Sequence, residues 1–312
     1  MAALENLTIY IAGHGGLVGS ALVRRFSQLE GVDLVTAPRA ELDLTQSQAV
    51  ESFLQSVKPD VVIVAAGRVG GILANSLYPA DFIYENLLIQ ANLVHSSWQA
   101  GVKRLLNFGS ACMYPGECRQ PMSPEMLLSG KLEPTSEAYA IAKLAGLSLC
   151  TSYNRQHGTA YITLVPCNLY GPGDSFDPTQ SHVIAALLLK FHKARAGRVK
   201  CLEVWGDGRA RREFLYVDDL AEACELLLRS YEDSEPVNIG SGEFFAVREL
   251  AQAIADVVGY EGEIRWDTSR PAGAPEKLLD SSAVRALGWS PRTDLRTGLR
   301  QTYAWFLENH SG

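Results

Sequence analysis

A tyrosine and a lysine four residues apart, Tyr139 and Lys143, stand downstream of a glycine-rich run from Gly13 to Gly19. On a helix these two residues would lie on one face, one turn apart, so the ammonium is expected to stabilise a phenolate and lower the pKa of Tyr139. Such a tyrosine can pass a proton to a carbonyl oxygen. Each motif alone is weak evidence, but their order and spacing indicate a nicotinamide enzyme that acts on a carbonyl.

The glycine run has the sequence context of a phosphate-binding loop. Gly13, Gly16 and Gly19 follow an apolar segment, residues 8–12, and open a helical pattern. In this position, small residues let the backbone and a helix N-terminus approach a pyrophosphate. The context favours dinucleotide binding over a purely structural turn.

The end of the second apolar segment predicts which dinucleotide is bound. Residues 35–37 lack the Asp or Glu that would accept hydrogen bonds from a free ribose hydroxyl, and Arg39 follows. A guanidinium can hold a 2′-phosphate bidentately, which favours NADP over NAD. The alternative is a solvated loop arginine. Asp43 and Leu44 are placed to approach the adenine, although an acidic loop residue is equally often a helix cap.

Alternating apolar runs and helical patterns predict the fold that positions these motifs. The apolar runs are residues 8–12, 33–37, 60–66, 104–109 and 160–166, and the helical patterns are residues 18–29, 47–57, 82–100 and 136–157. This alternation predicts an α/β fold, a doubly wound parallel Rossmann sheet. Ligands of such sheets bind at the carboxyl ends of the strands, where the glycine loop, Ser110 and Asn168 are expected to converge.

The later part of the chain predicts a smaller C-terminal substrate-binding lobe. Turn-forming residues at 170–174 and 206–208 interrupt the alternation, residues 214–229 are typical of a returning strand and helix, and helical patterns follow at 247–258 and 295–307. The domains are therefore expected to be discontinuous. Residues 1–168 and about 213–240 would form the NADP-binding domain, and about 169–212 and 241–312 the substrate lobe.

Composition excludes several classes of function. The chain has 312 residues, 47% of them hydrophobic, and a net charge of -7 without a basic block, which argues against a nucleic-acid partner. We expect no membrane partner, because neither a signal segment nor an apolar run of spanning length is present. Six scattered cysteines show neither a disulfide framework nor a metal signature, so no metal is expected and a reduced, cytoplasmic location is favoured.

Nine sequence segments make a resemblance specific. They are GHGGLVGS, RVGGI, NSLYPADFIYEN, GSACMYP, EAYAIAK, NLYGPGDSF, SHVIAALL, VWGDGRARREF and EKLLD. Together they resemble the GDP-L-fucose synthases, a family of extended short-chain dehydrogenases/reductases, from near the start of the chain to about residue 280. The resemblance implies epimerisation of GDP-4-keto-6-deoxy-D-mannose at carbons 3 and 5, then NADPH-dependent reduction at carbon 4.

The resemblance also implies roles for individual residues. Ser110 would hold the keto oxygen, Tyr139 would supply its proton, and Lys143 would bind the nicotinamide ribose while tuning the tyrosine. The alternative for Ser110 is a turn hydroxyl at the end of a strand. Its position ahead of Tyr139 in the same expected cleft favours the catalytic role.

Cys112 and His182 match the acid/base pair of the family. Hydrogens on both carbons beside a carbonyl are acidified, and inversion of either centre needs proton removal on one face and delivery on the other. A thiol and an imidazole can serve these two roles. By default, a lone cysteine is a small buried hydrophobe and a lone histidine is structural. The other five cysteines keep that default.

The remaining site residues are also implied by the resemblance. Lys190 and Arg212 would face the GDP diphosphate, although Lys190 would otherwise be a solvated helix charge and an arginine beside Arg212 is an alternative contact. Substrate contacts are expected from Ser110, Cys112, Asn168, Val183, Lys190, Trp205, Arg212 and Lys277. Cofactor contacts are expected from Gly13, Gly15, Gly16, Leu17, Val18, Gly19, Arg39, Asp43, Leu44, Tyr139, Lys143, Pro166, Asn168, Leu169 and His182.

One departure and three alternatives accompany the resemblance. Some members of the family carry an arginine at the position of Gly15, where it contributes to 2′-phosphate recognition. Related GDP-sugar enzymes of colitose or deoxyheptose pathways share the framework, and a catalytically silent dinucleotide-binding sensor is a third possibility. The resemblance further implies a homodimer packed through two long helices, about residues 81–99 and 137–153.

Overall fold

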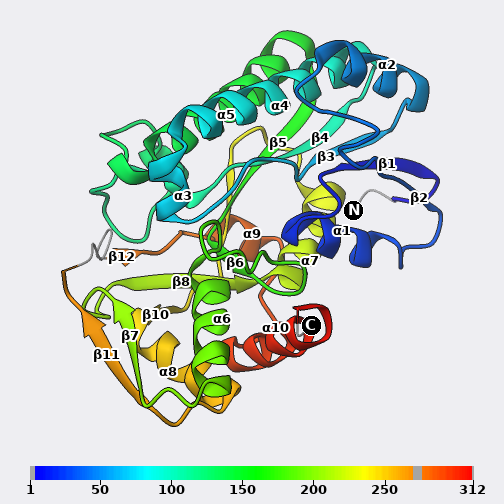
Figure 1. The fold of residues 1–312 in the computed structure, drawn as a ribbon. Helices are drawn as coiled ribbons and strands as arrows, with labels where there is room; N and C mark the ends of the chain where they lie inside the picture. The colour runs from blue at the N-terminus through cyan, green and yellow to red at the C-terminus, as the bar shows by residue number, and fades with distance from the viewer. Residues whose placement is uncertain (1–3, 270–275, 311–312) are drawn as a thin grey trace.

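The computed structural model describes residues 4–269 and 276–310. At its centre is a six-stranded parallel sheet with the strand order β2-β1-β3-β4-β5-β9 (Figure 1). The strands are β1 (Leu7–Ala12), β2 (Val32–Val35), β3 (Val61–Val64), β4 (Arg104–Phe108), β5 (Ala160–Pro166) and β9 (Val237–Ile239). The doubly wound α/β fold predicted from the sequence is confirmed.

Helices cover both faces of this sheet because successive side chains of each strand point to opposite sides. Ile9 and Ile11 belong to the core shared with α1 (Leu17–Phe26) and α7 (Val217–Ser230). Tyr10 and Ala12 belong to the opposite core, shared with α2 (Ser47–Val57), α4 (Pro79–Gln99) and α5 (Glu137–His157). Figure 1 shows α2, α4 and α5 above the sheet and α1 and α7 below it.

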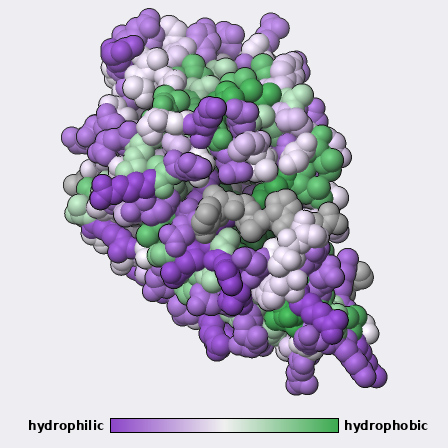
Figure 2. Space-filling view, turned by 90° about the vertical axis from the view of Figure 1, so that its left-hand side faces the viewer, coloured by the Kyte–Doolittle hydropathy of each residue, from purple (hydrophilic) through white to green (hydrophobic). Residues whose placement is uncertain are grey.

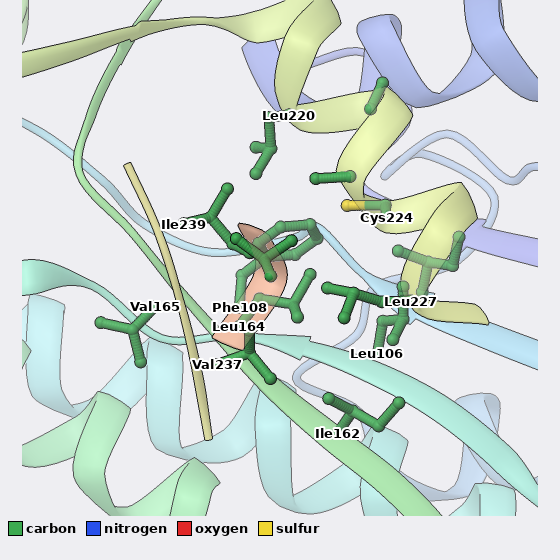
Figure 3. Close-up of a cluster of buried hydrophobic side chains, with 14 of the residues drawn as sticks. Leu106, Phe108, Ile162, Leu164, Val165, Leu220, Cys224, Leu227, Val237 and Ile239 are labelled. Carbon is green, nitrogen blue, oxygen red and sulfur yellow. The ribbon is translucent and has the colours of Figure 1, made fainter. Parts of the chain in front are cut away.

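The core below the main sheet contains one of the six cysteines, Cys224. In Figure 3, Leu227 of α7 lies beside Leu106 of β4, and Leu220 and Cys224 of α7 project into the same cluster of buried side chains. Cys224 is fully buried, and this burial raises the pKa of its thiol. In this apolar setting Cys224 packs as a small hydrophobic residue.

A second group of elements lies below the main sheet in Figure 1. In its sheet, β8 (Arg211–Tyr216) pairs with β6 (Asn168–Tyr170), β10 (Phe244–Ala246) and β12 (Glu276–Lys277), and β7 (Cys201–Trp205) pairs separately with β11 (Glu263–Asp267). Its helices are α6 (Val183–Ala196), α8 (Val247–Val258) and α10 (Leu295–His310). Side chains from these elements form a core of their own.

One expectation about the chain path was wrong. The strand that begins near Phe214 was expected to return to the main sheet, but β8 lies in the second sheet, and the return is made by β9, which pairs with β5. The three residues of β9 are too few to show a period. The division into two domains stays a prediction, and residues 270–275 and 311–312 of the expected substrate lobe lie outside the described residues.

Short elements complete the described chain. They are α3 (Ile72–Leu77), α9 (Ser282–Ala286) and the 3₁₀ turns η1 (Ala111–Met113), η2 (Pro124–Met126) and η3 (Pro134–Ser136). Throughout residues 4–269 and 276–310, no helix combines the length and the apolar character needed to cross a membrane.

Candidate active site

The glycine run lies where the strand order reverses, between β1 and its neighbours β2 and β3. Gly13 follows β1 with φ of +83°, and a Cβ there would lie 2.6 Å from the Cα of Ala66, which follows β3. A Cβ on Gly19 would lie 2.0 Å from the carbonyl oxygen of Gly13. The loop is thus closed tightly against the first turn of α1, which contains no acidic residue. Gly16 caps this helix ahead of Leu17 and Val18, so the loop fits a dinucleotide pyrophosphate.

The predicted ribose side of this site lies just past β2. Arg39 is exposed. Asp43 accepts hydrogen bonds from the backbone N–H and the hydroxyl of Thr45, at 3.0 and 2.8 Å, and these bonds, with the charge of Arg39, lower the pKa of Asp43. The carbonyl of Leu44 accepts a bond from Asn92. The space around a Cβ on Gly15 is open to 4 Å, so a larger side chain could be accommodated there.

Ser110 and Tyr139 come together at the carboxyl end of β4. Ser110 caps η1, and its hydroxyl accepts a 3.2 Å hydrogen bond from the backbone of Cys112. Tyr139 lies in the first turn of α5. Its ring packs edge-on with the ring of Phe82, and the two ring centroids are 6.1 Å apart. Burial raises the pKa of Tyr139, as does the charge of Cys112, whereas a hydrogen bond from the Ser110 side chain lowers it. The phenol is therefore protonated at neutral pH and carries a proton that it can donate to a substrate oxygen.

Lys143 is buried beside Tyr139, and its surroundings differ from those expected from the sequence. Its Nζ lies 5.8 Å from the centre of the Tyr139 ring and donates a 2.8 Å hydrogen bond to the carbonyl of Phe108. The side chain is only 3% exposed, and this burial lowers the pKa of Lys143 to about 8. The expected lowering of the tyrosine pKa was wrong, because desolvation by burial is the largest cause of the shift and raises the pKa of Tyr139.

Cys112 lies near both Tyr139 and Arg212, a cation of the second sheet. It is half-buried in η1, and a thiolate there would raise the pKa of both Tyr139 and Arg212. Arg212 lies on β8, where burial lowers its pKa while the charges of Glu133 and Cys112 raise it. The structure therefore brings a thiol, a phenol and a guanidinium into one electrostatic neighbourhood, although they come from three separate elements.

The second sheet gathers more of the expected substrate contacts. Arg212 is paired in register with Lys277 of β12, and Asn168 of β6 donates a 2.9 Å hydrogen bond to the carbonyl of Glu213. Trp205 ends β7 and is 52% exposed. The two expected cofactor contacts nearby lie at the crossing between the sheets, with Pro166 ending β5 and Leu169 lying in the middle of β6.

The remaining expected residues lie on α6. His182 is the N-cap of this helix, Val183 is its first residue, and Lys190 follows two turns later. Burial lowers the pKa of His182 and so favours the neutral imidazole. Burial also lowers the pKa of Lys190, whereas the nearby charge of Glu203 raises it.

Glu213 is a supporting residue that the sequence reasoning missed. This fully buried carboxylate accepts hydrogen bonds from the backbone N–H groups of Gly242, at 2.7 Å, and Leu279, at 3.0 Å. These bonds hold the strand of Arg212 beside the segment of Lys277. The only sequence signal for this role was an acidic residue directly after the arginines of the segment RARREF. Its hydrogen-bond partners, Gly242 and Leu279, are distant in sequence, so the signal could not be interpreted.

The structure therefore supplies a glycine loop that fits a dinucleotide and a phenol, Tyr139, that can protonate a carbonyl oxygen, with the thiol of Cys112 near that phenol. His182 enters from a different element, at the start of α6. Within residues 4–269 and 276–310, no group of three or more His, Cys, Asp or Glu side chains is placed to hold a metal ion.

The chain is similar to known proteins over nearly its whole length. The model of the NAD dependent epimerase/dehydratase family matches residues 9–240. GDP-L-fucose synthase 1 of Arabidopsis thaliana is 52% identical over 305 residues, covering 98% of this chain and 94% of the relative. GDP-L-fucose synthase of Escherichia coli (strain K12) is 50% identical over 315 residues and 98% of each chain.

A solved structure supports the same fold. It is a GDP-D-glycero-L-gluco-heptose synthase from Campylobacter jejuni in the presence of NADPH, with 36% sequence identity and a TM-score of 0.88. The match covers 99% of this chain and 100% of that one.

Proposed function

The chain belongs to the NAD dependent epimerase/dehydratase family, and we propose that it converts GDP-4-keto-6-deoxy-D-mannose to GDP-L-fucose. In this reaction carbons 3 and 5 are inverted and carbon 4 is reduced. The observation that carries the proposal is the position of Cys112, two residues after Ser110 and close enough to Tyr139 and Arg212 for a thiolate there to raise the pKa of both. A simple carbonyl reductase needs the tyrosine but no thiol beside it.

The cofactor of the enzyme is NADPH, which supplies the hydride for carbon 4 when bound. Gly13, Gly16 and Gly19 would hold its pyrophosphate at the N-terminus of α1, and Arg39 its 2′-phosphate. Lys143 of α5, which is hydrogen-bonded to the carbonyl of Phe108 at the end of β4, would hold the nicotinamide ribose.

We assign the proton transfers to three side chains. For inversion, Cys112 and His182 remove a proton from a carbon beside the carbonyl and deliver one to its opposite face. Ser110 and Tyr139 stabilise the negative charge that develops on the carbonyl oxygen in between. For reduction, the protonated phenol of Tyr139 gives its proton to that oxygen. Arg212 and Lys190 bind the GDP diphosphate.

Incubation with NADPH and GDP-4-keto-6-deoxy-D-mannose, followed by NMR of the product, tests the proposal. We expect GDP-L-fucose. A reduced sugar with uninverted carbons 3 and 5 would contradict the epimerase assignment. Absence of turnover with any GDP-sugar would favour the silent sensor.

A second candidate substrate is a GDP-deoxyheptose, which the 36% identity to the Campylobacter jejuni heptose synthase favours. Related GDP-sugars, including a colitose precursor, belong in the same assay. The substrate with the highest kcat/KM identifies the pathway, because the framework alone does not discriminate among the sugars.

Cofactor selectivity gives a quantitative prediction. Arg39→Ala should lower kcat/KM for NADPH by about 10- to 100-fold and leave that for NADH nearly unchanged, because only NADPH carries the phosphate that the guanidinium would bind. Gly15→Arg should raise the preference for NADPH, since the space around that position is open. Both efficiencies are measured for each variant. Equal use of the two cofactors by the parent enzyme would contradict the assignment.

We also propose a homodimer formed by α4 and α5. Tyr84 on α4 is 65% exposed and Ile141 on α5 is 41% exposed. Figure 2 shows hydrophobic residues gathered on the upper part of the molecule, where these helices lie in Figure 1. Tyr84→Asp combined with Ile141→Asp should yield monomers in sedimentation experiments, because charges would be desolvated in the interface. An unchanged mass would contradict this interface.

A reducing compartment, the cytoplasm, is the location we propose for the enzyme. All six cysteines are free in the structure, and proton transfer by Cys112 requires a free thiol.

A further inference from the structure

His182 follows a compact turn that hydrogen bonds hold together. The side chain of Asp177 accepts bonds from the backbone N–H groups of Thr179, at 2.8 Å, and Gln180, at 3.1 Å. The carbonyl of Asp177 accepts a 3.0 Å bond from the backbone of Ser181. Because residues 177–181 form one braced unit, the position of that unit sets where the next residue, His182, enters the site.

The loop after β3 docks onto this turn through a glycine. The backbone N–H of Gly71 donates a 3.1 Å hydrogen bond to the carbonyl of Gln180. A Cβ on Gly71 would lie 2.6 Å from the carbonyl oxygen of Ser181. With φ of -69° and ψ of -177°, the backbone of Gly71 is accessible to any residue. The glycine is therefore required for space alone.

Two buried asparagines order the loop: Asn86 joins it to α4, and Asn75 holds its end against the first turns of α3. Asn86 accepts a 3.1 Å bond from the backbone N–H of Arg68 and donates a 2.9 Å bond to its carbonyl. Asn75 donates bonds to the carbonyls of Gly70, at 2.9 Å, and Gly71, at 3.1 Å. The asparagines are 1% and 8% exposed, so breaking these bonds would leave buried polar groups unpaired. A methyl group at Gly71 would thus have to displace the turn.

We propose that Gly71, braced by Asn75, is a positioning residue that sets the imidazole of His182 for proton transfer during inversion. The inference rests on the proposed function, because it takes His182 as one of the two acid/base groups. It gives a role to the RVGGI and NSLYPADFIYEN segments, which supply the loop and both asparagines. Displacing a reacting group by about 1 Å can cost about 100-fold in rate, so we expect inversion to slow by about 10- to 100-fold in Gly71→Ala.

The test compares inversion with solvent exchange in deuterium oxide. His182→Asn provides the reference pattern, in which Cys112 still removes protons and returns deuterium to the same face, so exchange exceeds inversion. Gly71→Ala should reproduce this excess. Gly197→Ala is the matched control at the other end of α6, where the new Cβ would lie 3.2 Å from the carbonyl of Lys193, and it should keep the parental ratio.

Each outcome decides between the inference and the proposed function. Parental inversion in folded Gly71→Ala, with His182→Asn impaired, overturns the positioning role. Equal losses of exchange and inversion in Gly71→Ala also overturn it, because they indicate general damage to the site. Parental inversion in His182→Asn overturns the proposed role of His182 itself. If Gly71→Ala does not fold, Asn75→Ala, which loosens the loop without adding a methyl group, must show the excess of exchange or the inference fails.

Discussion

Replacement of Tyr139 by phenylalanine is expected to lower turnover by about 100- to 10,000-fold, the usual contribution of a positioned acid. The substitution keeps the ring and its edge contact with Phe82 and removes only the hydroxyl. That hydroxyl is held protonated by burial beside Cys112 and is hydrogen-bonded by Ser110. Without it, the alkoxide that forms at carbon 4 has no neighbouring phenol to neutralise it.

The measurement is steady-state NADPH oxidation with the GDP-sugar, accompanied by thermal unfolding of each variant. Tyr303→Phe is the matched control, because it also deletes the hydroxyl of a buried tyrosine, here one that contacts His192 at 2.9 Å. We expect near-parental turnover in the control. A folded Tyr139→Phe variant with near-parental turnover would rule out the acid role of Tyr139.

Elements with a strong period were predictable from the sequence. The segment 160–166 coincides with β5 and the pattern at 47–57 with α2, because a buried parallel strand is a continuous apolar run and a surface helix shows one apolar stripe. The strand β9 was missed because three residues carry no period, and β8 was assigned to the wrong sheet. Pairing partners depend on the whole fold and leave no local signal.

Part of the candidate site was likewise predictable from the sequence, and part was not. The carboxyl ends of β1 and β4 could be predicted to meet, and the structure places the glycine loop and Ser110 at these ends. That Cys112 and Arg212 share one site was implied only by the resemblance, because the spacing of residues on η1 and β8 carries no signal of which distant segments come together. The sign of the pKa shift at Tyr139 was also missed, since burial is a property of packing and not of the spacing between Tyr139 and Lys143.

The contact between Gly71 and residues 180–181 had no readable signal either. RVGGI is visible as a glycine-rich segment, but the residues that Gly71 contacts lie far along the chain. The catalytic roles assigned to these residues stay predictions that only the variants can test.

Cys112→Ser should separate epimerisation from reduction. A serine hydroxyl is a far poorer base than a thiolate near neutral pH, so the variant should lose nearly all deuterium incorporation at carbons 3 and 5, by about 100-fold or more. Tyr139 and Lys143 are unchanged in this variant, so reduction of uninverted substrate should persist and yield a different 6-deoxy sugar. Cys201→Ser, at a half-buried cysteine on β7, is the matched control and should keep parental exchange.

His182→Asn should impair inversion by a different route, because the neutral imidazole that burial maintains is replaced by an amide that does not titrate. Here exchange should continue through Cys112, while delivery to the opposite face fails. His192→Asn, ten residues further along α6, is the control for loss of a histidine from the same helix. Product NMR in deuterium oxide reads both configuration and label in each variant. Full exchange and inversion in folded Cys112→Ser and His182→Asn would contradict the two-group mechanism, because proton transfer at carbon would then need neither side chain. Only the proposed role of Tyr139 in carbonyl reduction would remain.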